Sequence, residues 1–375
     1  MRQILTTHVG SLPRGSELTP LLLARDQGKP YDAATLERLV QAAVEDAVEK
    51  QEAAGVSIVS DGELGKVGYA TYIKERLSGF GGNVARKPAL DLASLPELRR
   101  KLALIMGEQE FVRASCVGPV HLRDLDPCRD DIRRFCRALE GRSVRGFLNA
   151  ASPGLITAFQ PNAYYPSHEK YLADLVSAMR PEYSAIAASG MQLQLDCPDL
   201  AMARHTGYQD LSEEEFLQVA AANVEALNAA TSDIAPEKMR MHLCWGNYEG
   251  PHDCDIPLER VLDIVLRARP ATILFEAANA RHEHEWKVWA EATIPEDKVL
   301  APGLIDTRSN CLEHPELIAQ RLERFAGIVG VGRVIASTDC GFGTFAGYGK
   351  IDPAVTWKKL RALRAGADIA AARLS

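Results

Sequence analysis

The sequence lacks the features of membrane-embedded and exported proteins. No apolar run approaches the roughly 20 residues that an α-helix needs to cross a bilayer, and the first residues contain no apolar signal-peptide region. The eight cysteines have no paired spacing, so they indicate reduced thiols, most of them merely buried, and no disulfide framework. These absences predict a cytoplasmic protein without a membrane partner.

The sequence also lacks an excess of positive charge. Its 43 lysines and arginines are outnumbered by 50 aspartates and glutamates, which gives a net charge of −7. No basic patch is visible along the chain, so we expect no nucleic-acid partner.

Internal repeats, low-complexity tracts and interdomain linkers are absent as well. Hydrophobic residues make up 46% and charged residues 25% of the 375 residues, which is ordinary for a soluble globular enzyme. A chain of this length fits into one α/β barrel. We therefore expect a single domain over residues 1–375.

Short apolar segments alternate with helical patterns along the chain. Residues 3–9 and 56–60 predict strands, and Asp32 is a suitable N-cap for a helix over about 34–54 between them. Such strand–helix–strand units build parallel sheets. Further strands are predicted near residues 113, 147, 194, 241, 274, 302 and 336. Further helices are predicted over about 129–141, 167–188 with an interruption near Pro181, 212–230 with a capping box, 257–268, 315–326 and 353–373.

His242 and Cys244 are the most informative pair in the sequence. They lie two residues apart at the end of an apolar segment, just before Gly246. Because side chains two residues apart on a strand share a face, the imidazole and the thiol offer half of a site for a metal such as zinc. The alternative explanation is a buried cysteine beside a core histidine.

Two further apolar strands end in residues that bind metals. Segment 272–276 ends in Glu276, and segment 334–341 leads into Cys340. Packing alone does not require polar groups at these points. Strand ends that carry His, Cys, Glu and Cys predict a site at one rim of a barrel, where the carboxyl ends of the strands meet.

Seven motifs occur in an order that resembles a known family. The resemblance is to the C-terminal, catalytic barrel of cobalamin-independent methionine synthase and its single-domain relatives, and it spans nearly the whole chain. The motifs are Thr6–Pro13, Asp61–Glu63, Leu195–Pro198, His242–Cys244, Phe275–Glu276, Pro302–Asp306 and Asp339–Gly341.

The resemblance implies a (β/α)8 TIM barrel. Nine strands are predicted, one more than such a barrel holds. The family places the third barrel strand near residue 147, so the strand near 113 is assigned to an excursion over about residues 66–125, between the second and third barrel strands.

The resemblance also implies a zinc-dependent thiol methyltransferase. It would convert homocysteine to methionine with a donor of the 5-methyltetrahydrofolate type, and a zinc-bound thiolate would be the nucleophile. His242, Cys244, Glu276 and Cys340 would hold Zn²⁺, and two thiolate ligands would keep the substrate sulfur electron-rich. Hydrolytic zinc sites more often use histidine and carboxylate ligands, and Glu276 is the ligand expected to leave when the thiol arrives.

Ser11, Glu63 and Asp196 match the homocysteine-binding residues of the family, and Asp306 matches a rim residue that would orient His242 or relay a proton. Two carboxylates beside a metal suit a substrate ammonium group. The alternative explanation is that they pair with nearby arginine or lysine.

Several points stay open at this stage. The family's full-length members are about twice as long as this chain, so the donor is a folate, a corrinoid-borne methyl group or a small alkyl electrophile. The main alternative function is a zinc-dependent thiol alkyltransferase such as epoxyalkane:coenzyme M transferase, whose acceptor thiol carries a sulfonate. Arg281 would bind a substrate carboxylate or sulfonate, and which of the two it binds would separate the two reactions. A metal-free decarboxylase and a non-catalytic binding protein are weaker alternatives. The oligomeric state, including a homo-oligomer, and the roles of Cys197, His282 and His284 are also open.

Overall fold

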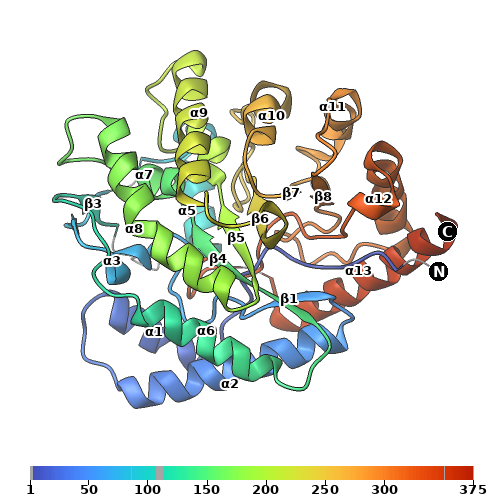
Figure 1. Ribbon diagram of the computed structural model, residues 1–375, viewed down its shortest axis with the longest axis horizontal. Coiled ribbons are helices and arrows are strands. Elements are labelled where there is room, and N and C mark those ends of the chain that lie inside the picture. Colours follow the sequence, from blue (N-terminus) through green and yellow to red (C-terminus); the bar gives the residue numbers. More distant parts are fainter. Residues whose placement is uncertain (1–2, 86, 107–112, 350, 375) are drawn as a thin grey trace.

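The computed structural model describes residues 3–85, 87–106, 113–349 and 351–374. Its centre is a curled sheet of six parallel strands (Figure 1), which pair in the order β1-β4-β5-β6-β7-β8. The strands are β1 Ile58–Ser60, β4 Arg145–Ala151, β5 Gln192–Asp196, β6 Met239–His242, β7 Thr272–Phe275 and β8 Val299–Pro302.

Two further segments lie between β8 and β1. Parallel bridges join Thr6 to Ala336, and Leu300 of β8 to Val334. On the other side, the backbone N–H groups of Ser57 and Ile58 donate to the Thr6 carbonyl oxygen. The predicted strands near residues 4 and 336 therefore form isolated bridges and no continuous strands, and they connect the two outer strands of the sheet.

Side chains alternate between the two faces of the sheet. On β6, Met239 and Met241 join the main apolar core beneath the surrounding helices, as Leu193 and Leu195 do on β5. The residues between them face the inside of the curl, where Arg240 donates to Thr7 Oγ1 and to the His8 carbonyl oxygen. This period of two places His242 on the inner face.

Helices surround the sheet on its outer side (Figure 1). Asp32 accepts the N–H groups of Ala34 and Thr35, and Ser212 forms the predicted capping box with Glu215. The surrounding helices are α2 Ala33–Ala53, α6 Asp126–Leu139, α8 His168–Ala188, α9 Glu213–Ala230, α10 Leu258–Leu266, α11 Trp286–Glu291, α12 Pro315–Val329 and α13 Pro353–Arg373.

The predicted interruption of the helix near Pro181 is wrong. Helix α8 runs unbroken through Pro181 although proline lacks the N–H that a helix interior uses. Tyr171 and Leu175 before the proline and Tyr183 after it are all buried, and Arg180 is anchored to the Ala229 carbonyl oxygen at the end of α9. This packing offsets the local cost of the proline.

The excursion contains short elements outside the parallel sheet. Strands β2 Phe80–Gly81 and β3 Ser115–Cys116 pair antiparallel with each other, so the strand predicted near residue 113 lies outside the sheet. Part of that predicted segment, residues 111–112, falls outside the described residues. The helices here are α3 Ile73–Arg76, α4 Leu90–Ala93 and α5 Pro96–Met106, and two more, α1 Leu18–Asp26 and α7 Pro153–Phe159, lie elsewhere in the chain.

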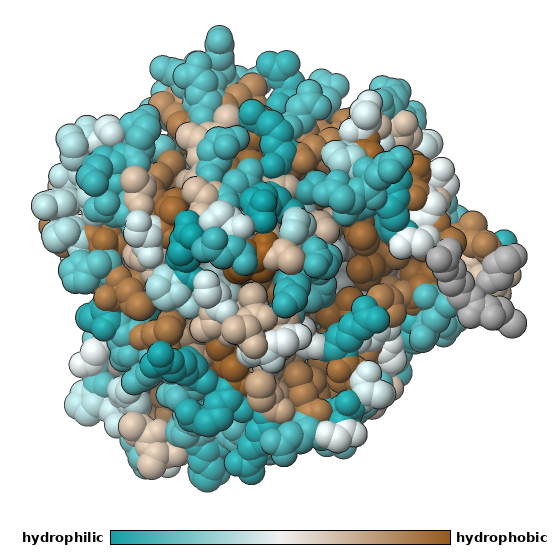
Figure 2. Space-filling view, in the orientation of Figure 1, coloured by the Kyte–Doolittle hydropathy of each residue, from teal (hydrophilic) through white to brown (hydrophobic). Residues whose placement is uncertain are grey.

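The surface shown in Figure 2 is a mixture of hydrophilic side chains and smaller apolar patches. Within the described part of the chain, no helix combines the length and the apolar character that crossing a bilayer requires.

Candidate metal centre

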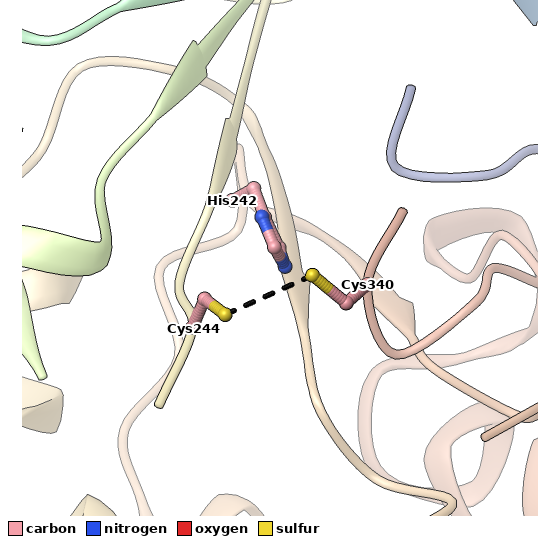
Figure 3. A group of neighbouring side chains, drawn as sticks. All are labelled: His242, Cys244 and Cys340. Atoms are coloured by element: carbon pink, nitrogen blue, oxygen red, sulfur yellow. Dashed lines mark hydrogen bonds between the residues drawn. The ribbon is translucent and has the colours of Figure 1, made fainter. Parts of the chain in front are cut away.

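His242, Cys244 and Cys340 converge at the carboxyl end of the sheet. His242 ends β6, Cys244 follows two residues later, and Cys340 comes from the segment that pairs with Thr6 and Leu300. One donor atom from each lies within 4.8 Å of the other two, and the two sulfurs are 3.9 Å apart (Figure 3). The structure therefore confirms that these strand ends meet.

The donor set fits a zinc ion. Tetrahedral zinc with Zn–S bonds of about 2.3 Å places two sulfur ligands about 3.8 Å apart, close to the observed separation. One imidazole and two thiols are donors that zinc prefers. Without a cation, the hydrogen bond with the Cys340 thiol raises the pKa of Cys244 well above its ordinary value, and burial adds to this. A cation between the two sulfurs would remove this obstacle to deprotonation of the Cys244 thiol.

Backbone groups hold two of these side chains in place. The N–H of Gly246 donates to Cys244 Sγ over 3.2 Å. His242 Nε2 lies 3.1 Å from the carbonyl oxygen of Asp339, the residue before Cys340. The ring is thus fixed against the segment that supplies the second thiol, and burial lowers its pKa to about 4, so the imidazole is neutral and able to bind a metal.

Glu276 lies beside this group but is not one of the three clustered donors. One carboxylate oxygen accepts the Trp245 N–H over 2.8 Å, and the other accepts from Asn279 and Arg281. Burial opposes its ionisation, but Arg281 prevails and holds the pKa of Glu276 below its usual value. The fourth predicted ligand is therefore an ionised carboxylate held by an arginine.

The predicted substrate residues face the same cavity. Ser11, Glu63 and Asp196 line it together with His242 and the two cysteines. Its remaining lining residues include Val9, Tyr69, Asn149, Pro198, Met202, Asn247, Gly341 and Thr344. The metal donors and the two carboxylates thus share one space.

The environment of the two carboxylates bears on the alternative that they only balance nearby cations. Lys66 Nζ is 4.0 Å from Glu63 Oε2 and donates to the Asn149 carbonyl oxygen instead, over 2.7 Å. Among the described residues, Glu63 Oε2 has no hydrogen-bond partner. Burial raises the pKa of Glu63 to about 7 and that of Asp196 to about 6. The cations and hydrogen-bond donors of the protein therefore only partly compensate the negative charge of the Glu63 and Asp196 carboxylates.

The backbone is strained at Glu63, one of the residues that line this cavity. Glu63 has a φ of 54°, in the left-handed region that residues other than glycine rarely adopt. Gly62, the residue before it, also has a positive φ. A side chain at this position would bring its Cβ atom to 3.0 Å from the Leu12 side chain. The turn therefore directs the Glu63 carboxylate into the cavity at a conformational cost.

Asp306 lies with Arg308 and not with the metal donors. Arg308 Nε donates to Asp306 Oδ1 over 3.0 Å, and Lys359 Nζ donates to the Asp306 carbonyl oxygen.

Asp339 and Asn149 are site residues that sequence reasoning missed. Asp339 Oδ1 accepts the N–H groups of Ala277 and Ala278, and Asn149 Nδ2 donates to Asp196. For Asp339, the sequence did offer a signal, because this residue stands next to Cys340.

Comparisons with known proteins agree with this geometry. Residues 4–356 match the family described as the cobalamin-independent synthase, catalytic domain. A methionine synthase of Thermococcus kodakarensis is 23% identical over 97% of this chain and 92% of its own length. A 5-methyltetrahydropteroyltriglutamate–homocysteine methyltransferase of Aeromonas salmonicida is 23% identical over 90% of this chain but only 40% of its own length.

A solved structure shares the fold. The B12-independent methionine synthase of Shewanella sp. W3-18-1, in complex with selenomethionine, superposes with a TM-score of 0.75 over 100% of this chain and 99% of that one, at 20% sequence identity. Since the family match extends over most of the chain, from the first bridged segment into α13, the chain belongs to the cobalamin-independent synthase catalytic-domain family.

Proposed function

We propose that this protein is a zinc-dependent methyltransferase that moves a methyl group to the sulfur of homocysteine and so forms methionine. The observation that carries the proposal is the single cavity lined by His242, both cysteines and the Glu63 and Asp196 carboxylates. The relatives, a methionine synthase and a homocysteine methyltransferase by name, support the same reaction class.

The fold that we propose for this activity is a closed (β/α)8 TIM barrel. It forms one catalytic domain over residues 1–375, with residues 66–125 as an excursion. The bridges at Thr6 and Ala336 support closure, because they supply the two positions missing from the six-stranded sheet. We also propose that the protein acts in the cytoplasm on small molecules.

His242, Cys244 and Cys340 are the proposed metal ligands, and Glu276 is the proposed fourth. When bound there, zinc would stabilise the thiolate form of the substrate sulfur at neutral pH. Glu276 is the ligand best suited to leave, because Asn279 and Arg281 already bind its carboxylate and would stabilise it after release.

The protein's own groups would hold the rest of the amino acid. Glu63 and Asp196 lie on the lining of the cavity, where a substrate ammonium would favour their ionised forms and satisfy the unpartnered Glu63 Oε2. Ser11 lines the same cavity and offers a hydroxyl to the substrate. Binding of this kind sets the orientation of the sulfur toward the methyl donor.

The alkyltransferase alternative is less well supported. It needs a cation for the sulfonate of its acceptor thiol, but the Arg281 guanidinium lies 2.5 Å from Glu276 and 3.4 Å from Asp255. An arginine paired with two carboxylates is poorly placed to bind a further anion.

The test is a transfer assay with purified, zinc-loaded protein. Homocysteine would be offered with a methylfolate and, separately, with a methylcorrinoid, and coenzyme M with an epoxide would serve as the third arm. We expect methionine from at least one of the first two arms and its loss in Cys340→Ser. His284→Ala, at an exposed position, is the matched control and should keep its activity. Product only in the epoxide arm would refute the methyltransferase proposal.

A further inference from the structure

A second cluster of metal-binding side chains lies in the loops next to the candidate centre. His205 follows a short 3-10 turn after β5, and His252 and Asp255 lie in the loop after β6. One donor atom from each lies within 4.8 Å of the other two. Both imidazoles are fully buried, and the Asp255 side chain is 8% exposed. None of the three belongs to the proposed methyl-transfer site.

The two oxygens of Asp255 have different surroundings. His282 Nε2 lies 3.1 Å and Arg281 Nη1 lies 3.4 Å from Oδ2, so cationic donors occupy that side. Oδ1 lies 3.3 Å from His205 Nδ1 and 3.0 Å from His252 Nδ1, and His252 Nδ1 is also 3.0 Å from Oδ2. Oδ1 is therefore the oxygen that lies near both His205 and His252, while Oδ2 is shared by His252, His282 and Arg281.

The hydrogen-bonding pattern of His252 leaves its Nδ1 without an obvious proton. Nε2 lies 3.1 Å from the carbonyl oxygen of Tyr248, and a carbonyl can only accept, so Nε2 carries the hydrogen. In the neutral ring, the Nδ1 lone pair then points at the lone pairs of Asp255. A cation between the two groups would turn this repulsion into two bonds. The arrangement also matches metal-bound histidines, whose second nitrogen usually donates to a carbonyl or carboxylate.

His205 provides the second, independent observation. It is completely buried, yet neither of its ring nitrogens makes a hydrogen bond within the described part of the chain. A buried polar group without a partner destabilises the fold, and a bound ligand that accepts or donates there would remove this cost. Its Nδ1 lies 3.3 Å from Asp255 Oδ1, one of the two oxygens that His252 Nδ1 also contacts.

We propose that His205, His252 and Asp255 form a second metal site that binds a divalent transition ion such as zinc. The nitrogen–oxygen separations of 3.0 and 3.3 Å suit ligands of one ion, because bonds of about 2.0–2.1 Å give edges of roughly 2.9–3.4 Å between octahedral and tetrahedral geometry. Two imidazoles and a carboxylate are donors that zinc accepts.

Such an ion would have a structural consequence for the first site. Arg281 connects Asp255 to Glu276, and its Nη2 also lies 3.4 Å from the Gly246 carbonyl oxygen. An ion at Asp255 would fix the loop after β6 and, through Arg281, the position of Glu276. The two metal sites would thus be linked while their ligands stay separate.

The first experiment counts zinc in the folded protein. Purified chain would be loaded with excess zinc and dialysed, and its metal content measured. We expect about two zinc ions per chain, and about one in His252→Asn, where asparagine tolerates the left-handed backbone (φ 58°) that His252 adopts. His205→Ala should lose the same equivalent, and His284→Ala should keep both. One zinc in the unaltered chain, or two in both cluster variants, would overturn the proposal.

The second experiment does not depend on changing the cluster. In the Cys244→Ser/Cys340→Ser variant, X-ray absorption should show the remaining zinc with only nitrogen and oxygen ligands near 2.0–2.1 Å and no sulfur near about 2.3 Å. Complete loss of zinc from this variant would mean that the cluster is a polar network that holds no ion. That result would refute the second site and leave the methyltransferase proposal untouched.

Discussion

At the scale of single residues, the two carboxylates of the cavity are the sharpest test of what the site binds. Glu63→Gln and Asp196→Asn remove negative charge and keep the side-chain size. If the pair binds an ammonium group, each change should weaken homocysteine binding by about 1.5–3 kcal/mol, the cost of losing a hydrogen bond to a charged group. Calorimetric titration of the zinc-loaded protein would measure it.

The control for this prediction is a thiol of similar size without the amine. Its affinity should change much less, because it makes no contact with the missing charge. Equal weakening of both thiols would mean that Glu63 and Asp196 only maintain the fold.

A buried acid outside the cavity predicts a pH dependence of stability. Burial raises the pKa of Asp199 to about 7 from 3.8, although Ser152 and Asn223 hydrogen-bond to it. The folded state therefore holds the proton more tightly than the unfolded state, and this stabilisation is full below about pH 4 and is lost as the pH rises through 7.

Asp199→Asn cannot ionise and so removes this dependence. Urea midpoints at pH 5 and pH 8 should differ more in the unaltered chain than in the variant. The same difference in both would show that Asp199 does not titrate in this range.

At the scale of elements, α8 shows where local sequence rules fail. A proline in a helix interior costs about 3 kcal/mol relative to alanine, which favours a break at Pro181. The buried tyrosines and leucines on both sides of it, and the anchored Arg180, keep the helix continuous. Packing partners of this kind come from distant parts of the chain, so the sequence of the helix does not reveal them.

Pro181→Ala should therefore stabilise the protein. The new N–H can bond to the Ser177 carbonyl oxygen, and we expect a gain of about 1–2.5 kcal/mol after the greater freedom of the unfolded chain is subtracted. Urea unfolding would measure the gain, with Ser184→Ala on the exposed face of α8 as the control. A loss of stability would mean that the proline ring is itself needed for packing.

At the scale of the whole molecule, the sequence predicted the parallel α/β order and the meeting of three metal donors. Both follow from local signals: apolar segments with a period of two, and polar residues where these segments end. It did not predict that Arg281 would hold Glu276, or that Asp255 would gather three histidines. Those contacts depend on how the loops after β5, β6 and β7 fold over one another, and loops carry no periodic signal.

The joining of the first and last strand segments also bears on how the protein is made. Val9 N–H donates to Thr338 Oγ1 across 329 residues of chain, and Figure 1 shows both termini on the same side of the molecule. At a synthesis rate of about 5–20 residues per second, the first segment waits roughly 16–66 s for its partner to leave the ribosome. Cys340 emerges in the same interval. The nascent chain therefore exposes an unpaired edge until late in translation, and before then it cannot bring together the two thiols of the candidate metal centre.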